Sequence, residues 1–394
     1  MDLRLQIADK QTVAESSLDA RGNPIKRSVM DALGRLNQHA EESDEIHFRD
    51  AALRRYREYE SIREDSILGR IFEIANSIHD EIDAFVCIGK YDSLVASRAL
   101  VYACWDPFHN ELDRGQRGSK PRVYFLSPPV DNDYFCSLVS RLTLHAFGRS
   151  ECERRWMLMP ILEDPRVDSH CEFPDWQTQQ VIAAGQWLLG KIPTSLRSRY
   201  CVPMIGTRTR SSTRAWIDSF SPRECFQWEP ALEGPANLFD APGLMAGAMM
   251  GLDVVQMAGG AHEVNQHLDA SAIAVQIAEL IRRDGFPKIQ TTVQALGAFV
   301  EWAECWNRCR FGIVPTADWN LRLHVAAPRT DAIESLASLS PRDLQDSGRE
   351  HEERCHDSTR QDVILEIPPI DTNGLGRLFQ TWMIATTLAV DETR

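Results

Sequence analysis

Glu304 is the residue whose setting best suits acid–base chemistry. Leu296, Val300 and Glu304 share one column of an amphipathic helical pattern, with Phe299 and Ala303 beside them. The carboxylate then lies at the edge of an apolar stripe, where burial would raise its pKa toward that of a useful general base. A surface glutamate that borders an amphipathic helix explains the same pattern, so the sequence leaves both interpretations open.

Histidine and cysteine pairs raise the question of a metal site. His351 and Cys355 share a helical face, as do Cys305 and Cys309, but the second histidine of a zinc helix is displaced to His356. A polar loop and buried thiols account for these residues, so we expect no metal and no cofactor. The basic turn at 115–120 lacks the residue order of a phosphate-binding P-loop.

Short apolar runs alternate with helical patterns along the chain, and this alternation predicts parallel sheets covered by helices on both faces. The runs expected to be buried strands are Ala84–Gly89, Val123–Leu126, Trp156–Leu162, Tyr200–Ile205, Lys288–Val293, Gly312–Val314 and Val363–Ile367. The expected helices include Leu94–Tyr102, Gln179–Leu189, Ala241–Met257, Ser271–Ile281 and Leu375–Leu388.

Length and composition limit the classes of protein. A chain of 394 residues is long enough for two domains. Its net charge of −14 disfavours nucleic acid and anionic membranes as partners. The sequence has no apolar leader at its start and no apolar run of about 18 residues, and its ten cysteines are scattered, several of them in apolar runs. We therefore expect a cytoplasmic protein with free thiols.

Breaks in the pattern suggest the domain organisation. Residues 1–50 are expected to form an N-terminal arm, and residues 51–190 a first α/β domain that ends at the break around Gly190. A second α/β domain is expected over 191–340, followed by a polar loop and a C-terminal strand and helix over 341–394.

Five groups of segments carry a family pattern. They are Phe85–Leu94 (FVCIGKYDSL), 232–244 (LEGPANLFDAPGL), 251–254 (GLDV), 299–304 with 312–315 (FVEWAE, GIVP), and 375–379 with 385–389 (LGRLF, ATTLA). Their order and spacing resemble the phosphoglucose isomerase family, most closely its compact bacterial members. The resemblance implies two αβα-sandwich sugar isomerase domains with parallel sheets, a sugar phosphate as substrate, and a homodimer.

The resemblance also implies roles for particular residues. Glu304 matches the catalytic glutamate of the family, and Gly89, Lys90 and Ser93 lie in its substrate-binding glycine turn. Arg308 falls on a lysine of the family and is expected to contact the substrate.

Other positions depart from the family pattern. The stretch at 160–165 matches the phosphate loop but offers no hydroxyl group and has carboxylates at Glu163 and Asp164. Pro235 stands where the family has an arginine, and His324 is not a clear match for the ring-opening histidine. Three functions remain: a glucose-6-phosphate isomerase, an inactive paralogue that acts as a sugar-phosphate sensor or protein-interaction module, and a different enzyme on the same scaffold. We expect isomerisation to be at least about a thousandfold slower than in an ordinary member.

Overall fold

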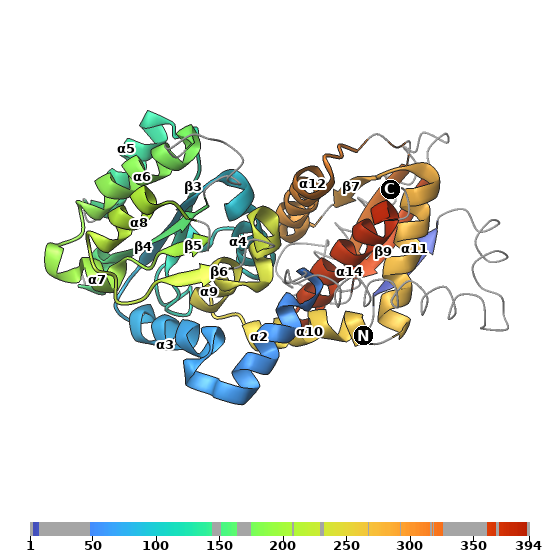
Figure 1. Cartoon of the computed structure of the whole chain (residues 1–394), viewed down its shortest axis with the longest axis horizontal. Helices are drawn as coiled ribbons and strands as arrows, with labels where there is room; N and C mark the ends of the chain where they lie inside the picture. The colour runs from blue at the N-terminus through green and yellow to red at the C-terminus, as the bar shows by residue number, and fades with distance from the viewer. Residues whose placement is uncertain are drawn as a thin grey trace, which may run out of the picture. The chain divides into compact units, whose positions relative to one another are not determined.

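The chain folds into two compact units (Figure 1). The computed structural model describes residues 3–7, 48–143, 151–163, 175–206, 209–228, 232–266, 268–291, 293–315, 317, 319–325, 361–367 and 370–391. Unit 2 is Ser43–Ala258, and unit 1 combines Met1–Glu42 with Gly259–Arg394. Most of the expected N-terminal arm, the polar loop before the last strand and the His351–His356 segment lie outside the described residues.

Unit 2 is built on a five-stranded parallel sheet. Its strands, in spatial order, are β3 (Arg122–Leu126), β2 (Ala84–Gly89), β4 (Trp156–Leu162), β5 (Met204–Gly206) and β6 (Phe226–Trp228). Every residue of β2 and β4 is buried, which explains their continuous apolar sequences, because helices cover both faces of a parallel sheet.

Helices cover the sheet of unit 2 on both sides. α4 and α6 each contact β2, and α9 packs against α3 and α4. In Figure 1, α5, α6 and α8 lie together on one side of the sheet, and α3 and α9 lie on the other. The α-helices are α2 (Phe48–Ile62), α3 (Ile67–His79), α4 (Tyr91–Cys104), α5 (Asn132–Thr143), α6 (Trp176–Leu189), α7 (Arg197–Tyr200), α8 (Ser211–Asp218) and α9 (Ala241–Met249). Short 3-10 turns are η1 (Arg63–Asp65), η2 (His109–Glu111), η3 (Cys152–Arg154), η4 (Thr194–Leu196) and η6 (Gly234–Phe239).

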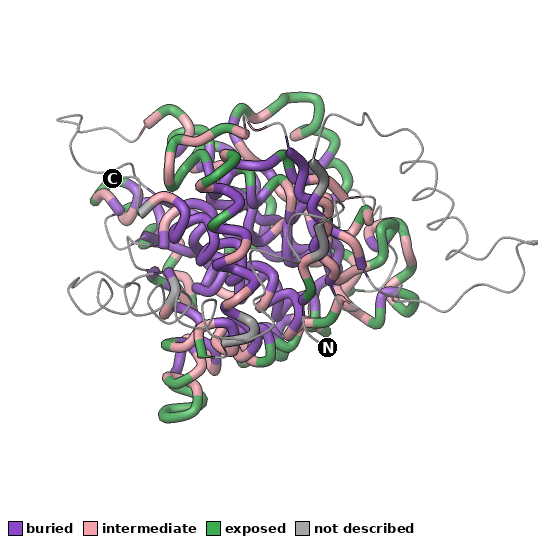
Figure 2. Tube along the Cα trace, turned by 90° about the vertical axis from the view of Figure 1, so that its right-hand side faces the viewer, coloured by how far each residue is buried: buried purple, intermediate pink, exposed green. Residues whose placement is uncertain are grey.

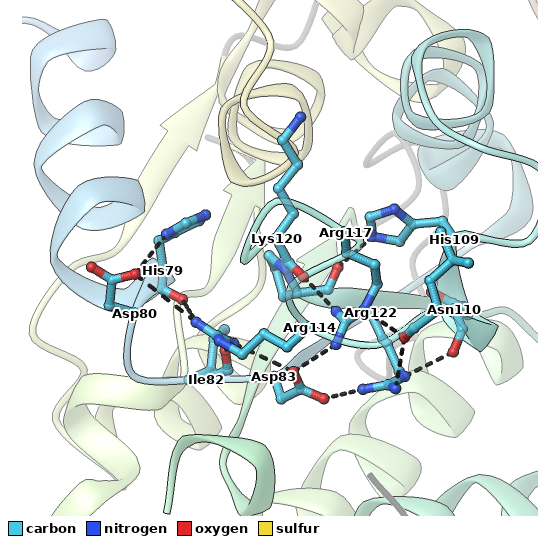
Figure 3. A network of polar contacts seen from close by, with 12 residues as sticks. His79, Asp80, Ile82, Asp83, His109, Asn110, Arg114, Arg117, Lys120 and Arg122 are labelled. Carbon is cyan, nitrogen blue, oxygen red and sulfur yellow. Dashed lines mark hydrogen bonds and ion pairs between the residues drawn. The ribbon is translucent and has the colours of Figure 1, made fainter. Parts of the chain in front are cut away.

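A buried aspartate holds the amino-terminal edge of this sheet (Figure 3). The carboxylate of Asp83 pairs with Arg114 at 3.3 Å, with Arg117 at 2.7 Å, and with Arg122. Arg117 and Arg122 also donate to the main-chain oxygen of Leu112. The cluster therefore ties the connection between α4 and β3 to the start of the sheet.

Unit 1 contains a four-stranded sheet in the order β1 (Arg4–Ile7), β9 (Gln361–Ile367), β8 (Trp319–Val325) and β7 (Lys288–Thr291). β7, β8 and β9 are parallel, and β1 pairs antiparallel with β9 at the edge. The helices are α11 (Leu268–Asp284), α12 (Gly297–Phe311), α14 (Thr372–Asp391) and the turn η7 (Gln294–Leu296), while α10 (Val254–Gln266) contains the boundary between the units. The start of the expected arm is thus a strand.

Burial follows the predicted pattern in most of the described chain. Figure 2 shows the buried stretches as purple segments, with exposed stretches in green mostly toward the outside. In unit 1 the core centres on aromatic contacts between α12 and α14, where Trp302 lies 4.6 Å from Phe379 between ring centroids. Within the described residues, no helix combines the length and the apolar character that a membrane span requires.

Two of the expected strands need correction. The strand predicted at Tyr200–Ile205 begins only at Met204, because Tyr200 ends the short helix α7. The strand predicted at Gly312–Val314 is not formed. Gly312 adopts φ 68° and caps the end of α12, with its N–H donating to the oxygen of Arg308.

One expected helix is divided, and one expected boundary lies inside a unit. The helix predicted at Ala241–Met257 is interrupted at Gly251, whose φ of 74° is left-handed, so that α9 and α10 are separate. Gly190 lies inside unit 2, because β5 and β6 continue the sheet begun by β2 and β4.

Candidate functional site

The topology of unit 2 indicates a candidate ligand site at the carboxyl ends of β2 and β4. The chain leaves β2 toward β3 on one side and returns to β4 on the other side of β2. Ligands of open parallel sheets bind at such a reversal of strand order. The turns that follow these two strands contain Lys90 and Ser93 after β2, and Glu163 after β4.

Gly89 allows these two strands to approach each other closely. A Cβ atom on Gly89 would lie 2.9 Å from the main-chain oxygen of Ile161 in β4. This predicted site residue therefore has a packing role, because a side chain there would collide with the backbone of the neighbouring strand.

Lys90 is paired within the protein. Its Nζ donates to Oδ2 of Asp175 at 2.7 Å, and the Lys90 side chain is 12% exposed. Asp175 also accepts the main-chain N–H groups of Gln177 and Thr178 at the start of α6. Burial raises the pKa of Asp175, but the hydrogen bonds from Lys90 and Thr178 outweigh it and hold the pKa below its usual value.

Ser93 is buried near the first turn of α4. Its main-chain oxygen accepts a hydrogen bond from Nδ2 of Asn237 at 2.8 Å, and its N–H donates to Oδ1 of Asp92. The Ser93 hydroxyl group lowers the pKa of Glu163, although no hydrogen bond of normal geometry joins the two side chains. Ser93 thus belongs to a packed polar cluster.

Glu163 occupies the centre of this cluster. Its two carboxyl oxygens lie 3.1 and 3.2 Å from the main-chain nitrogen of Gly234, which donates its hydrogen to the carboxyl group. Gly234 adopts φ 62°, a left-handed conformation that glycine takes without steric cost. A Cβ atom on Gly234 would lie 3.9 Å from the Asp92 side chain, so Asp92 lies beside the same turn.

Burial first, and the nearby carboxylate of Asp92 second, raise the pKa of Glu163, which is about 8 in the folded protein. The N–H of Gly234 and the hydroxyl of Ser93 act in the opposite direction but are weaker. At neutral pH the Glu163 side chain is therefore mostly protonated. A carboxyl group with this pKa can exchange a proton near neutral pH, but this one is only 8% exposed.

The sequence indicates part of this cluster, because Glu163 falls in the expected phosphate loop and Lys90 in the glycine turn. The sequence pattern shows Glu163 as a carboxylate and not as a protonated, buried group. It gives no contact between Lys90 and Asp175, which are 85 positions apart. The N-capping pattern at Asp175, just before the helix that begins at Trp176, was the available signal.

Glu304 and Arg308 lie in unit 1, on α12, as the helical pattern predicted. Both side chains are exposed and are one helical turn apart. The opposite face of α12 is buried. Nε1 of Trp306 donates to Oγ1 of Thr386 in α14 at 3.0 Å, so the indole belongs to the core of this unit.

The remaining sequence candidates form no metal site within the described chain. Cys305 and Cys309 have sulfur atoms 3.7 Å apart on α12. No group of three or more histidine, cysteine, aspartate or glutamate side chains in the described ranges is arranged to hold a metal ion. His324 lies in β8.

Comparison with solved structures shows the fold. A hypothetical protein from Thermus thermophilus is similar over 99% of this chain and 94% of its own, with a TM-score of 0.72 and 15% identity. A glucose-6-phosphate isomerase from Chlamydia trachomatis is similar over 88% of this chain and 73% of its own, with a TM-score of 0.61 and 11% identity. The chain has a sugar isomerase-type fold.

The likeness is one of structure. No family model matches the chain, and no curated protein matches it in sequence. At the edge of the sheet where the strand order reverses, the hydrogen-bond donors are already bound by side chains of the protein. The N–H of Gly234 donates to Glu163, and the ammonium group of Lys90 donates to Asp175.

Proposed function

We propose that this chain is a sugar isomerase-fold protein without rapid sugar-phosphate isomerisation, which acts as a binding or protein-interaction module. The observation that carries the proposal is the hydrogen bond from the N–H of Gly234 to the carboxyl group of Glu163. A side chain of the protein takes the place that an anionic ligand would need.

A phosphate group at the carboxyl ends of parallel strands depends on N–H donors and cations. Here the Gly234 N–H is used by Glu163, and the ammonium group of Lys90 is used by Asp175. Binding a phosphate between them would break both contacts. The hydrogen bond to the protonated Glu163 is worth about 0.5–1.5 kcal/mol, and the charged one between Lys90 and Asp175 about 1.5–3 kcal/mol. The phosphate would also lie close to Asp92, a side chain of the same charge.

A second candidate is a glucose-6-phosphate isomerase with Glu304 as its base. In its favour, Glu304 is exposed on α12, and the cationic Arg308 is exposed one helical turn away. The resemblance of the sequence to that family supports the same role for Glu304. In this candidate the phosphate group is bound away from the Glu163 cluster.

A coupled assay of the interconversion of glucose 6-phosphate and fructose 6-phosphate tests the proposal. We expect kcat/KM to be at least about a thousandfold below that of an ordinary isomerase. This ratio corresponds to an activation free energy that is about 4 kcal/mol higher. We also expect Glu304→Gln to leave any residual rate unchanged. A kcat/KM within about tenfold of an ordinary isomerase, lost in Glu304→Gln but kept in Glu301→Gln on the same helix, would establish the second candidate.

A further inference from the structure

A second site in unit 2 lies along the open edge of its sheet. β3 is one of the two edge strands of this sheet, and a pocket of about 450 Å³ lies beside it, bounded by α4 and by the first turn of α5. Pockets that hold small molecules have volumes of about 300–1,000 Å³. This pocket is separate from the Glu163 cluster, since none of its lining residues belongs to that cluster.

The edge of β3 offers main-chain hydrogen-bonding groups to this pocket. The N–H of Arg122 donates to the oxygen of Asp83, so Arg122, Tyr124 and Leu126 direct their main-chain groups toward β2. Val123 and Phe125 direct theirs outward, because successive residues of a strand alternate. This parity identifies the residues whose backbone faces the pocket.

The first of these outward residues is already paired. The side-chain amide of Asn110, which is labelled in Figure 3, donates to the oxygen of Val123 at 2.7 Å and accepts its N–H at 3.0 Å. Phe125 is the next outward residue, and among the described residues its N–H and C=O make no hydrogen bond. Phe125 lines the pocket, and the strand parity directs its donor and its acceptor side by side away from β2, along the edge where the pocket lies.

Tyrosine rings and an arginine form the walls of the pocket. Tyr91 and Tyr102 come from α4, and the guanidinium group of Arg98 lies over both rings, at 5.9 and 5.8 Å from their centroids. Tyr134 from α5 also lines the pocket and is 49% exposed. The lining of the pocket includes Arg98 and no aspartate or glutamate, although the chain as a whole has a net charge of −14. The pocket is therefore suited to an anion with a flat ring.

We infer that this pocket binds a nucleoside monophosphate. The base stacks against the tyrosine rings and presents an adjacent donor and acceptor to the C=O and N–H of Phe125, while the phosphate group lies near Arg98. Every base can stack on an aromatic ring, so stacking alone selects little among the bases. The N–H and C=O of Phe125 are the groups that would select among them. The Asn110 side chain shows that an amide can pair with this edge in the same way, one outward residue earlier.

Isothermal titration of the full-length protein with AMP, GMP and UMP tests this inference. We expect at least one of them to bind with a Kd of about 1 mM or tighter. Arg98→Gln and Tyr134→Ala should each weaken that binding by about tenfold, because a hydrogen bond to a charged group and a stacked ring are each worth at least that much. The matched control, Arg154→Gln, changes an exposed arginine outside the pocket and should leave binding unchanged.

Two further ligands separate the base from the phosphate. Adenosine lacks the charge, and ribose 5-phosphate lacks the ring, so each should bind at least about tenfold more weakly than AMP. Absence of binding for all three nucleotides at about 10 mM would overturn the inference. It would also be overturned if ribose 5-phosphate bound as tightly as AMP, or if Tyr134→Ala, which alters a half-exposed side chain, bound normally.

Discussion

Glu163 accepts the main-chain N–H of Gly234 with both carboxyl oxygens, at 3.1 and 3.2 Å, although the two residues are 71 positions apart. The contact joins the end of β4 to the first residue of η6. It puts a protonated carboxyl group where a phosphosugar isomerase resemblance predicts an anion site. The response of the protein to pH and to substitution should therefore depend on this contact and on the packing around it.

The stability of the protein should depend on pH through Glu163. Its pKa is about 8 in the folded protein and about 4.3 in the unfolded chain. Between these values the folded state binds one more proton, so the free energy of unfolding falls as pH rises, by up to about 1.4 kcal/mol per pH unit. The stabilising effect of the proton is complete below the unfolded pKa and lost once pH passes the folded pKa.

Glu163→Gln, which stays neutral, should remove this dependence. We expect the wild-type protein to lose about 2–4 kcal/mol relative to Glu163→Gln between pH 5 and pH 8. Urea unfolding at several pH values measures the difference, and Glu64→Gln is the control because Glu64 is exposed. Parallel stability profiles for the wild type and Glu163→Gln would contradict a raised pKa at Glu163.

Gly234→Ala should destabilise unit 2 through backbone strain. At φ 62°, an L-residue costs about 1–2 kcal/mol more than glycine, while the added Cβ makes only ordinary contacts with Asp92 at 3.9 Å. Gly115→Ala is the matched control, because Gly115 has no left-handed φ and no atom within 4 Å of an added Cβ. Equal melting temperatures for the two variants would show that the left-handed turn at Gly234 is not required.

Asp83→Asn should be the most destabilising of these substitutions. It leaves the buried guanidinium groups of Arg117 and Arg122 without their carboxylate, and breaking a buried ion pair costs about 3–5 kcal/mol. Asp80→Asn is the control, because the Asp80 side chain is 84% exposed and 4.0 Å from Arg114. Thermal unfolding should show a large loss for Asp83→Asn and a change within about 0.5 kcal/mol for Asp80→Asn.

The fold was largely predictable because the central strands of the larger sheet are buried on both faces. Runs such as Ala84–Gly89 and Trp156–Leu162 are apolar at nearly every position, and this leaves few alternatives to a buried parallel strand. Two of the errors arose where a single glycine changes the backbone direction. Gly251 and Gly312 have apolar neighbours, so the local pattern resembled a continuing helix in one case and a strand in the other.

The candidate site was less predictable because its contacts join distant positions. The sequence suggested carboxylates near an anion site, but the pKa of Glu163 depends on burial and on Asp92, which a linear pattern does not reveal. Likewise, Lys90 was predicted to contact a substrate, and its partner Asp175 becomes evident only when α6 is placed beside β2.

The most direct test of the central claim observes the amide of Gly234 itself. In a deuterated, ¹⁵N-labelled sample, glucose 6-phosphate is titrated to about 10 mM, above the KM range usual for enzymes. Because Glu163 already accepts this N–H, we predict that the Gly234 resonance does not move. A saturable shift of that resonance, stronger in Glu163→Gln and absent with glucose, would contradict the account and place a phosphate at the end of β4.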